Sequence, residues 1–140
     1  MFEKILLAVD GSAHALRAAS QAADLARTMN SKELRVIVSY DPIPLYLGEP
    51  NMQIAYVNRK DESEKILKDA LKEIGDVSAK VFTQVLEGDT AARIIEAAEV
   101  NKSDVIVLGS RGLGSLAGLL LGSVSQKVVA HAPCPVLIVR

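Results

Sequence analysis

Apolar residues follow two alternating patterns along this chain of 140 residues. Short continuous runs, rich in Val, Ile and Leu, are separated by longer stretches in which apolar residues recur at helical spacing. Continuous runs of this length are typical of strands buried on both faces. They predict five strands, at residues 4–9, 34–40, 79–86, 105–108 and 135–139.

The stretches between the strands carry helix start and stop signals. Ser12 and Asp89 are suitable N-caps, Gly75 stands where a C-terminal cap belongs, and Ser123 with Gln126 has capping-box spacing. We therefore expect helices from Ser12 to about residue 30, from about residue 61 to 75, from Asp89 onward and from Ser123 onward. Their predicted inward faces comprise Leu16, Ala19, Ala23, Ala26 and Met29; Ile66, Leu67, Ala70, Leu71 and Ile74; Ala91, Ile94, Ile95 and Ala98; and Val124, Val128 and Ala132.

Strands and helices thus alternate from end to end. This order predicts one α/β domain spanning residues 1–140, with a five-stranded parallel sheet and helices on both faces. Ligands of such sheets bind at the carboxyl ends of the strands, near the switch in strand order. The turns expected there are 9–11, 39–41 and 109–123.

Residues 41–58 interrupt the alternation. They hold three of the five prolines and two of the three tyrosines and show no clear period. We expect an irregular connection that is either functional or mobile, because so long a connection is uncommon in a compact domain.

The turn after the fourth predicted strand is rich in glycine. Gly109 and Gly112 are followed, after nine intervening residues, by Gly122 and Ser123. A strand, a glycine-rich loop and a helix start together form an anion site, since N–H groups at the helix start lack intrahelical partners. The alternative is a flexible loop before a capped helix. The lysine of a P-loop is absent, and the late helix start argues against a dinucleotide fingerprint.

Composition narrows the function classes. A net charge of −1 with interspersed acids and bases argues against non-specific binding to nucleic acid or membranes, and no Trp is present for base stacking. The single cysteine, Cys134, allows no internal disulfide, and we expect a cytoplasmic protein. Neither His14 nor His131 has a nucleophilic partner at a defensible spacing, so both are interpreted as ordinary helix residues.

The chain resembles the universal stress protein family. The resemblance is carried by the opening run 4–12, by Gly88 and Asp89, by the glycine spacing and by the ending 131–140. It implies a Rossmann-like fold of the adenine nucleotide alpha hydrolase type and a homodimer. For members with the full glycine signature it also implies ATP binding.

Site residues follow from the resemblance position by position. Gly112, Gly122 and Ser123 would hold phosphates, and Gly109 the ribose side. Asp10 would approach the nucleotide and any Mg²⁺ bound to it, although an acid after a first strand is also a common turn residue. Ser39 would meet adenine, but Val38 stands where many members have histidine. The predicted set also includes Val9, Arg111, Val124 and Ser125.

The resemblance implies a nucleotide-sensing regulatory protein in the stress response. Two other functions remain open: a slow ATPase or nucleotidyl-transfer enzyme, and a dimeric scaffold without ligand. In the family's strand order the last strand, residues 135–139, lies at the sheet edge. Because it is apolar on both faces, we expect it to pair with its copy in a homodimer.

Overall fold

The computed structural model describes residues 1–111 and 121–140. Its centre is a parallel sheet of five strands in the order β3-β2-β1-β4-β5. The strands are β1 (Lys4–Ala8), β2 (Glu33–Tyr40), β3 (Lys80–Glu87), β4 (Val105–Gly109) and β5 (Val136–Val139). The predicted fold class is confirmed, and each strand lies within two residues of its predicted range.

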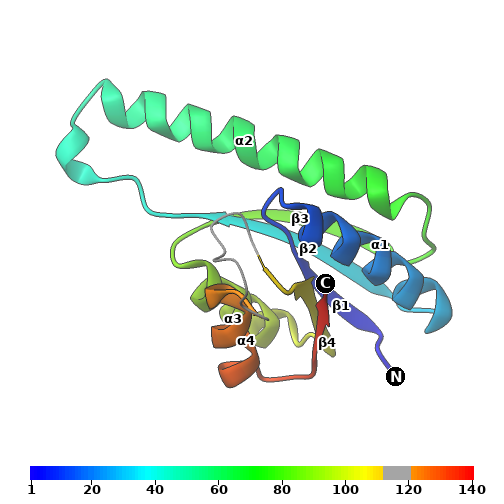
Figure 1. Ribbon diagram of the computed structural model, residues 1–140. Coiled ribbons are helices and arrows are strands. Elements are labelled where there is room, and N and C mark those ends of the chain that lie inside the picture. Colours follow the sequence, from blue (N-terminus) through cyan, green and yellow to red (C-terminus); the bar gives the residue numbers. More distant parts are fainter. Residues whose placement is uncertain (112–120) are drawn as a thin grey trace.

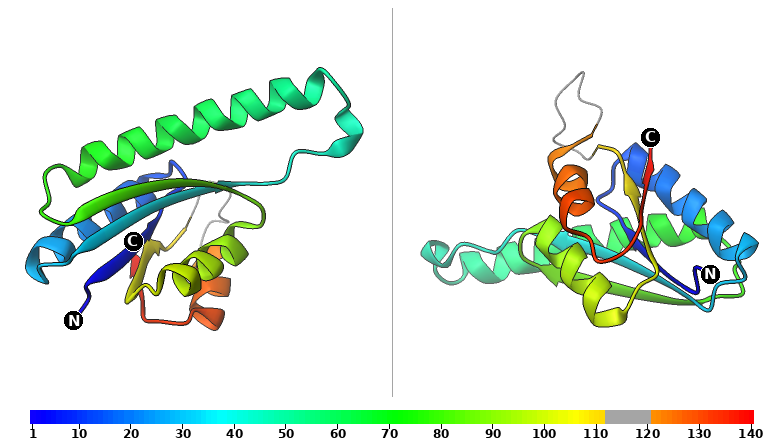
Figure 2. Two further views of the ribbon diagram at one scale, coloured as in Figure 1. Left: turned by 180° about the vertical axis from the view of Figure 1, so that it is seen from behind. Right: turned by 90° about the horizontal axis from the view of Figure 1, so that it is seen from below.

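Helices cover both faces of the sheet (Figure 1; Figure 2). On one face lie α1 (Ala13–Thr28) and α2 (Asn51–Ile74), and on the other lie α3 (Thr90–Asn101) and α4 (Ser123–His131). A short 3-10 helix, η1 (Leu45–Leu47), precedes α2. Within residues 1–111 and 121–140 no helix is long and apolar enough to cross a membrane.

Alternation along each central strand builds two separate cores. Ile5 and Leu7 of β1 contact the α1 and α2 side, whereas Leu6 and Ala8 contact the α3 and α4 side. The α1 face consists of small side chains, which let the helix lie close to the sheet: Ala15, Ala18, Ala19, Ala22, Ala23 and Ala26.

Three predicted caps are confirmed. The Ser12 hydroxyl accepts from the Ala15 N–H at 3.1 Å, and the Asp89 carboxylate accepts from the Ala92 N–H at 3.0 Å. Gly75 ends α2 with φ of 64°, a left-handed conformation that favours glycine. Two predicted inward residues are wrong, since Met29 and Leu71 are 37% and 38% exposed.

The start of α2 differs from the prediction by about ten residues. Residues 51–58, expected to be irregular, are helical. All buried residues of α2 lie from Ser63 onward, and its first half extends beyond the sheet (Figure 1). The first half therefore has no core-facing stripe by which periodicity could have revealed it.

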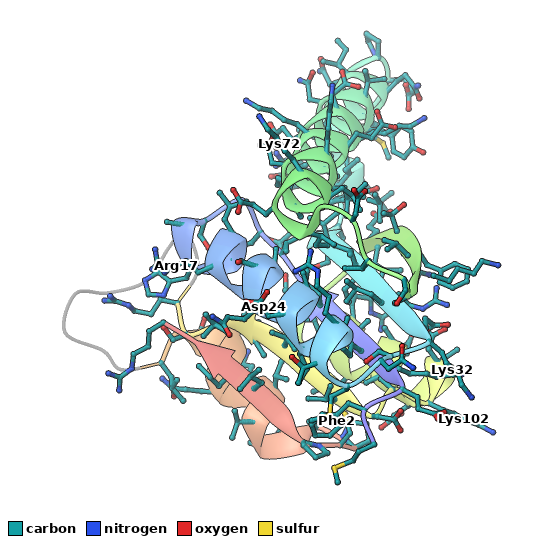
Figure 3. All side chains as sticks on the ribbon, turned by 90° about the vertical axis from the view of Figure 1, so that its right-hand side faces the viewer. Phe2, Arg17, Asp24, Lys32, Lys72 and Lys102 are labelled. Carbon is teal, nitrogen blue, oxygen red and sulfur yellow. The ribbon has the colours of Figure 1, made fainter. Side chains whose placement is uncertain are left out.

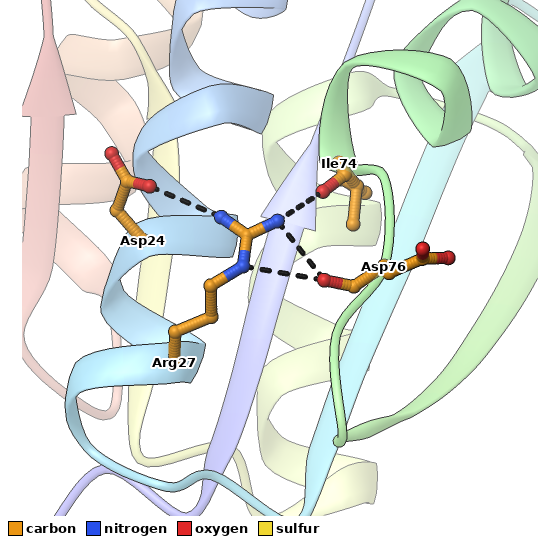
Figure 4. A network of polar contacts seen from close by, with 4 residues as sticks. All are labelled: Asp24, Arg27, Ile74 and Asp76. Atoms are coloured by element: carbon orange, nitrogen blue, oxygen red, sulfur yellow. Dashed lines mark hydrogen bonds and ion pairs between the residues drawn. The ribbon is translucent and has the colours of Figure 1, made fainter.

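Arg27, near the end of α1, forms hydrogen bonds with the carbonyl groups at the end of α2 (Figure 4). Its Nη2 donates to the carbonyl oxygens of Ile74 at 2.8 Å and Asp76 at 3.1 Å, and its Nη1 to Asp24 Oδ1 at 3.1 Å. The last carbonyls of a helix lack intrahelical donors, so the guanidinium supplies a C-terminal cap from a neighbouring helix.

Candidate functional site

Three neighbouring strands bring predicted site residues to one edge of the sheet. Val9 and Asp10 follow β1, Ser39 is the second-last residue of β2, and Gly109 ends β4. The β1–β4 pairing ends at Leu7 with Val107, and beyond it the Val9 N–H donates to the Ile37 carbonyl of β2 at 2.9 Å. This edge includes the switch point between β1 and β4, where ligands of open α/β sheets bind.

Asp10 has a structural role at this edge. Its Oδ1 accepts from the Ser12 N–H at 2.9 Å, which forms an Asx turn leading into α1. Gly11 follows with φ of 86°, so the turn requires glycine there. Asp10 therefore takes part in the turn, and its carboxylate lies at the switch point.

Gly109 is glycine because of α1. A Cβ built at this position would lie 2.8 Å from the His14 Cβ and 3.0 Å from the His14 carbonyl carbon. The first turn of α1 therefore occupies the space that a side chain would need. Close packing against α1 is thus a structural reason for glycine at position 109.

Ser110, which the sequence interpretation passed over, connects four elements. Its N–H donates to the Val139 carbonyl of β5 at 2.7 Å, and its own carbonyl accepts from the Gly122 N–H at 2.6 Å. The same carbonyl accepts from the Ser125 hydroxyl at 2.7 Å, at the start of α4. Its hydroxyl lies 3.0 Å from His14 Nδ1 of α1, and the residue is only 2% exposed.

The start of α4 differs from the predicted capping box. Gly122 is the N-cap and makes no side-chain cap bond. The Gln126 side chain reaches back past the N-cap and donates to the Leu121 carbonyl at 2.9 Å. Gln126 therefore does not occupy the Ser123 N–H, and the N–H groups of Ser123, Val124 and Ser125 have no intrahelical acceptor.

Apart from Gly112, the remaining predicted residues lie at the end of β2 and on either side of the undescribed residues 112–120. The Ser39 hydroxyl donates to Thr90 Oγ1 at 2.8 Å, which joins β2 to the start of α3. Arg111 and Val124 are half-buried, Ser123 is exposed and Ser125 is buried. Gly112 lies outside the described residues.

Basic and ionisable groups flank this edge. Arg17, on α1, lies toward the same edge as the site, far from Lys32 and Lys102 at the opposite end (Figure 3). Its Nε donates to the Arg140 carbonyl at 2.7 Å. At the end of β2, burial and then the nearby Glu87 and Tyr56 raise the pKa of Tyr40 above its usual range. Arg17 adds positive charge beside the site, while Tyr40 keeps its proton at neutral pH.

A match to known families decides the identity of this fold. The family model described as "Universal stress protein family" matches residues 1–140. The chain belongs to the universal stress protein family. The strand order and the helices on both faces agree with solved structures of this fold.

Individual universal stress proteins align along their whole length. A Thermus aquaticus member, from the region 3′ of a QAH/OAS sulfhydrylase, is 46% identical over 140 residues and covers 100% of both chains. Among solved structures, hypothetical protein MJ0577 has a TM-score of 0.87 at 28% identity, over 99% of this chain and 96% of that one. A universal stress protein solved in complex with cAMP has a TM-score of 0.70 at 29% identity, covering 97% and 94%.

His14 and Ser110, which contact each other at this edge, are not among the site residues predicted from the sequence. The sequence indicates an ordinary helix residue at His14, and Ser110 lies between two predicted site residues. The available signal is the position of Ser110 between Gly109 and Arg111, directly after the end of central strand β4. Cys134 is half-buried, and burial followed by the Asp104 charge raises the pKa of its thiol, while the Ile106 N–H lowers it.

Proposed function

We propose that the chain is an ATP-binding universal stress protein that acts as a nucleotide-sensing regulatory protein. The observation that carries the proposal is the start of α4. It lacks a side-chain cap and is held at the carboxyl edge of β4 through the Ser110 carbonyl. Helix N-termini attract phosphate through their N–H groups and their dipole.

Other parts of the edge suit the rest of a nucleotide. In this arrangement Gly112, Gly122 and Ser123 contact phosphates together with the N–H groups of Val124 and Ser125. Gly109 faces the ribose, Val9 and Ser39 lie near the base, and Asp10 approaches the nucleotide and the Mg²⁺ bound to it. Positively charged side chains nearby, including Arg111, favour binding of the phosphates electrostatically. The relative solved with cAMP supports an adenine nucleotide as the ligand class.

Magnesium fits this site only as a companion of the phosphates. Within residues 1–111 and 121–140 no group of three or more His, Cys, Asp or Glu side chains could hold a metal ion. Asp10 is the acid placed at the switch point, and Mg²⁺ characteristically binds through one or two carboxylates plus substrate phosphates and water. We therefore propose that Mg²⁺ enters with ATP, with Asp10 as its protein contact.

The test is a pair of substitutions at Gly122. Its φ of −75° is open to any residue, so neither substitution strains the backbone. Gly122→Asp should abolish ATP binding in calorimetry, because a carboxylate at the helix start repels phosphate. Gly122→Ala adds the Cβ without charge and should weaken binding less. Unchanged affinity in Gly122→Asp, with the fold intact by circular dichroism, would exclude the site.

The proposal also includes the oligomeric state and the chemistry. A homodimer through residues 135–139 would cover the open edge of β5, and the cytoplasm is the proposed compartment.

Fast hydrolysis normally needs a metal held by acids and a positioned water, and Asp10 alone does not supply these. Calorimetry that finds no ATP binding would favour the ligand-free scaffold, and measured turnover well above background would favour the enzyme.

A further inference from the structure

We propose that His14 is a positioning residue for the nucleotide site. Through Ser110 it fixes the start of α4 relative to the β1–α1 turn. This inference rests on the function proposed above and concerns how the binding geometry is maintained. It gives a function to a side-chain pair that joins segments 96 residues apart in the sequence.

The two halves of the site lie on opposite sides of the switch point. One half is the β1–α1 turn, where Asp10 and Ser12 form the Asx turn that begins α1. The other half is the start of α4, whose N-cap Gly122 is bonded to Ser110. The contact between His14 Nδ1 and Ser110 Oγ, at 3.0 Å, connects one half to the other.

Ser110 transmits this contact through its backbone. Its carbonyl accepts both the Gly122 N–H and the Ser125 hydroxyl, at 2.6 and 2.7 Å. A displacement of Ser110 therefore moves both groups that orient the first turn of α4. The N–H groups directed at phosphate belong to the same turn, so their direction depends on where Ser110 lies.

Packing leaves little freedom for an alternative arrangement. The His14 Cβ lies only 2.8 Å from where a Cβ of Gly109 would be, and Ser110 and Ser125 are each 2% exposed. Without the imidazole, the Ser110 hydroxyl faces a vacated space beside a half-buried helix turn. A buried hydroxyl without a partner is costly, so Ser110 would rotate or shift to find one.

Substitutions at the pair test the positioning role. His14→Ala should lower ATP affinity about tenfold in calorimetry, the effect of losing one hydrogen bond. It should also move the Gly122 and Ser123 amide resonances of the ligand-free protein. Ser110→Ala removes the same contact from the other side, so residue 110 is no longer held to α1, and it should reproduce both effects. The double variant should be no weaker than either single variant, because both remove the same contact.

His14→Asn separates positioning from direct ligand contact. The asparagine amide reaches Ser110 from the place of Nδ1 but has no equivalent of Nε2. If His14 acts through Ser110, this variant restores both affinity and amide positions. His131→Ala, at the far end of α4, is the matched control and should change neither.

Three results would overturn the inference. They are unmoved Gly122 and Ser123 amides in His14→Ala, additive effects in the double variant, and failure of His14→Asn to restore affinity. The last would assign His14 to direct contact with the ligand. The amide resonances are measured without nucleotide, so a protein that binds no ATP would refute the proposed function and still decide the role of His14.

Discussion

Single residues at the carboxyl edge show how far a sequence pattern indicates chemistry. The spacing of Gly109, Gly122 and Ser123 predicted their location at the edge, because glycine-rich turns after buried strands are local features. The reason for glycine at position 109 was not predictable, since it depends on α1, whose first turn lies almost 100 residues earlier. The His14–Ser110 pair stayed hidden for the same reason. Contacts between distant segments leave no local period.

Gly109→Ala tests this explanation directly. The added Cβ would lie 2.8 Å from the His14 Cβ and within 3.1 Å of the α1 backbone, so α1 must shift. We expect a loss of roughly 1–3 kcal/mol in the free energy of unfolding, as for other overpacked sites. Urea denaturation of the ligand-free protein measures it. An unchanged midpoint would mean that the space at Gly109 serves a ligand and not the helix.

Elements were predictable where they bury an apolar stripe or carry a cap. Ser12 and Asp89 marked the starts of α1 and α3, since their side chains satisfy N–H groups one turn later. The first half of α2 carries neither signal. It begins after Pro50, and its branched apolar residues face solvent, with Ile54 54% and Val57 43% exposed. Tertiary burial does not dictate this segment, so core periodicity could not reveal it.

The Arg27 cap gives a prediction at the same scale (Figure 4). Arg27→Ala removes the donors to the Ile74 and Asp76 carbonyls and should cost about 1 kcal/mol of unfolding free energy. Arg27→Lys should recover less than half, because an ammonium lacks the planar fork that reaches both oxygens. Thermal or urea denaturation provides the measurement.

A matched control is available on α2. Arg59 forms an exposed ion pair with Glu62 at 3.7 Å, and Arg59→Ala should cost only a few tenths of a kcal/mol. Equal losses in the Arg27 and Arg59 variants would show that Arg27 contributes charge alone. A larger loss at Arg27 identifies the bonds to the α2 carbonyls as the stabilising contacts.

At the scale of the whole molecule, the two edges of the sheet differ in chemistry. Edge strand β3 carries polar and charged side chains, with Thr83, Gln84 and Glu87 exposed. Such residues discourage pairing with another chain. Edge strand β5 (Val136–Val139) carries no polar or charged side chain, and Leu137 is 39% exposed. The strand order thus confirms the predicted edge position of the last strand and leaves an apolar edge that needs a cover.

Leu137→Lys tests whether a second copy provides that cover. Val136 and Ile138 pack against the α3 and α4 side, so a charge there would damage the core, whereas Leu137 is exposed. Light scattering at tens of micromolar should give twice the chain mass of 15.0 kDa for the unmodified protein and a mass near that of one chain for Leu137→Lys. Val100→Lys, at a 73% exposed position on α3, should remain dimeric. A monomeric unmodified protein contradicts the dimer altogether. An unpaired ammonium buried between two strands would separate the copies, so a Leu137→Lys variant that stays dimeric would place the interface on another apolar surface. The leading example of such a surface consists of the exposed apolar residues Leu45, Tyr46, Ile54, Tyr56 and Val57.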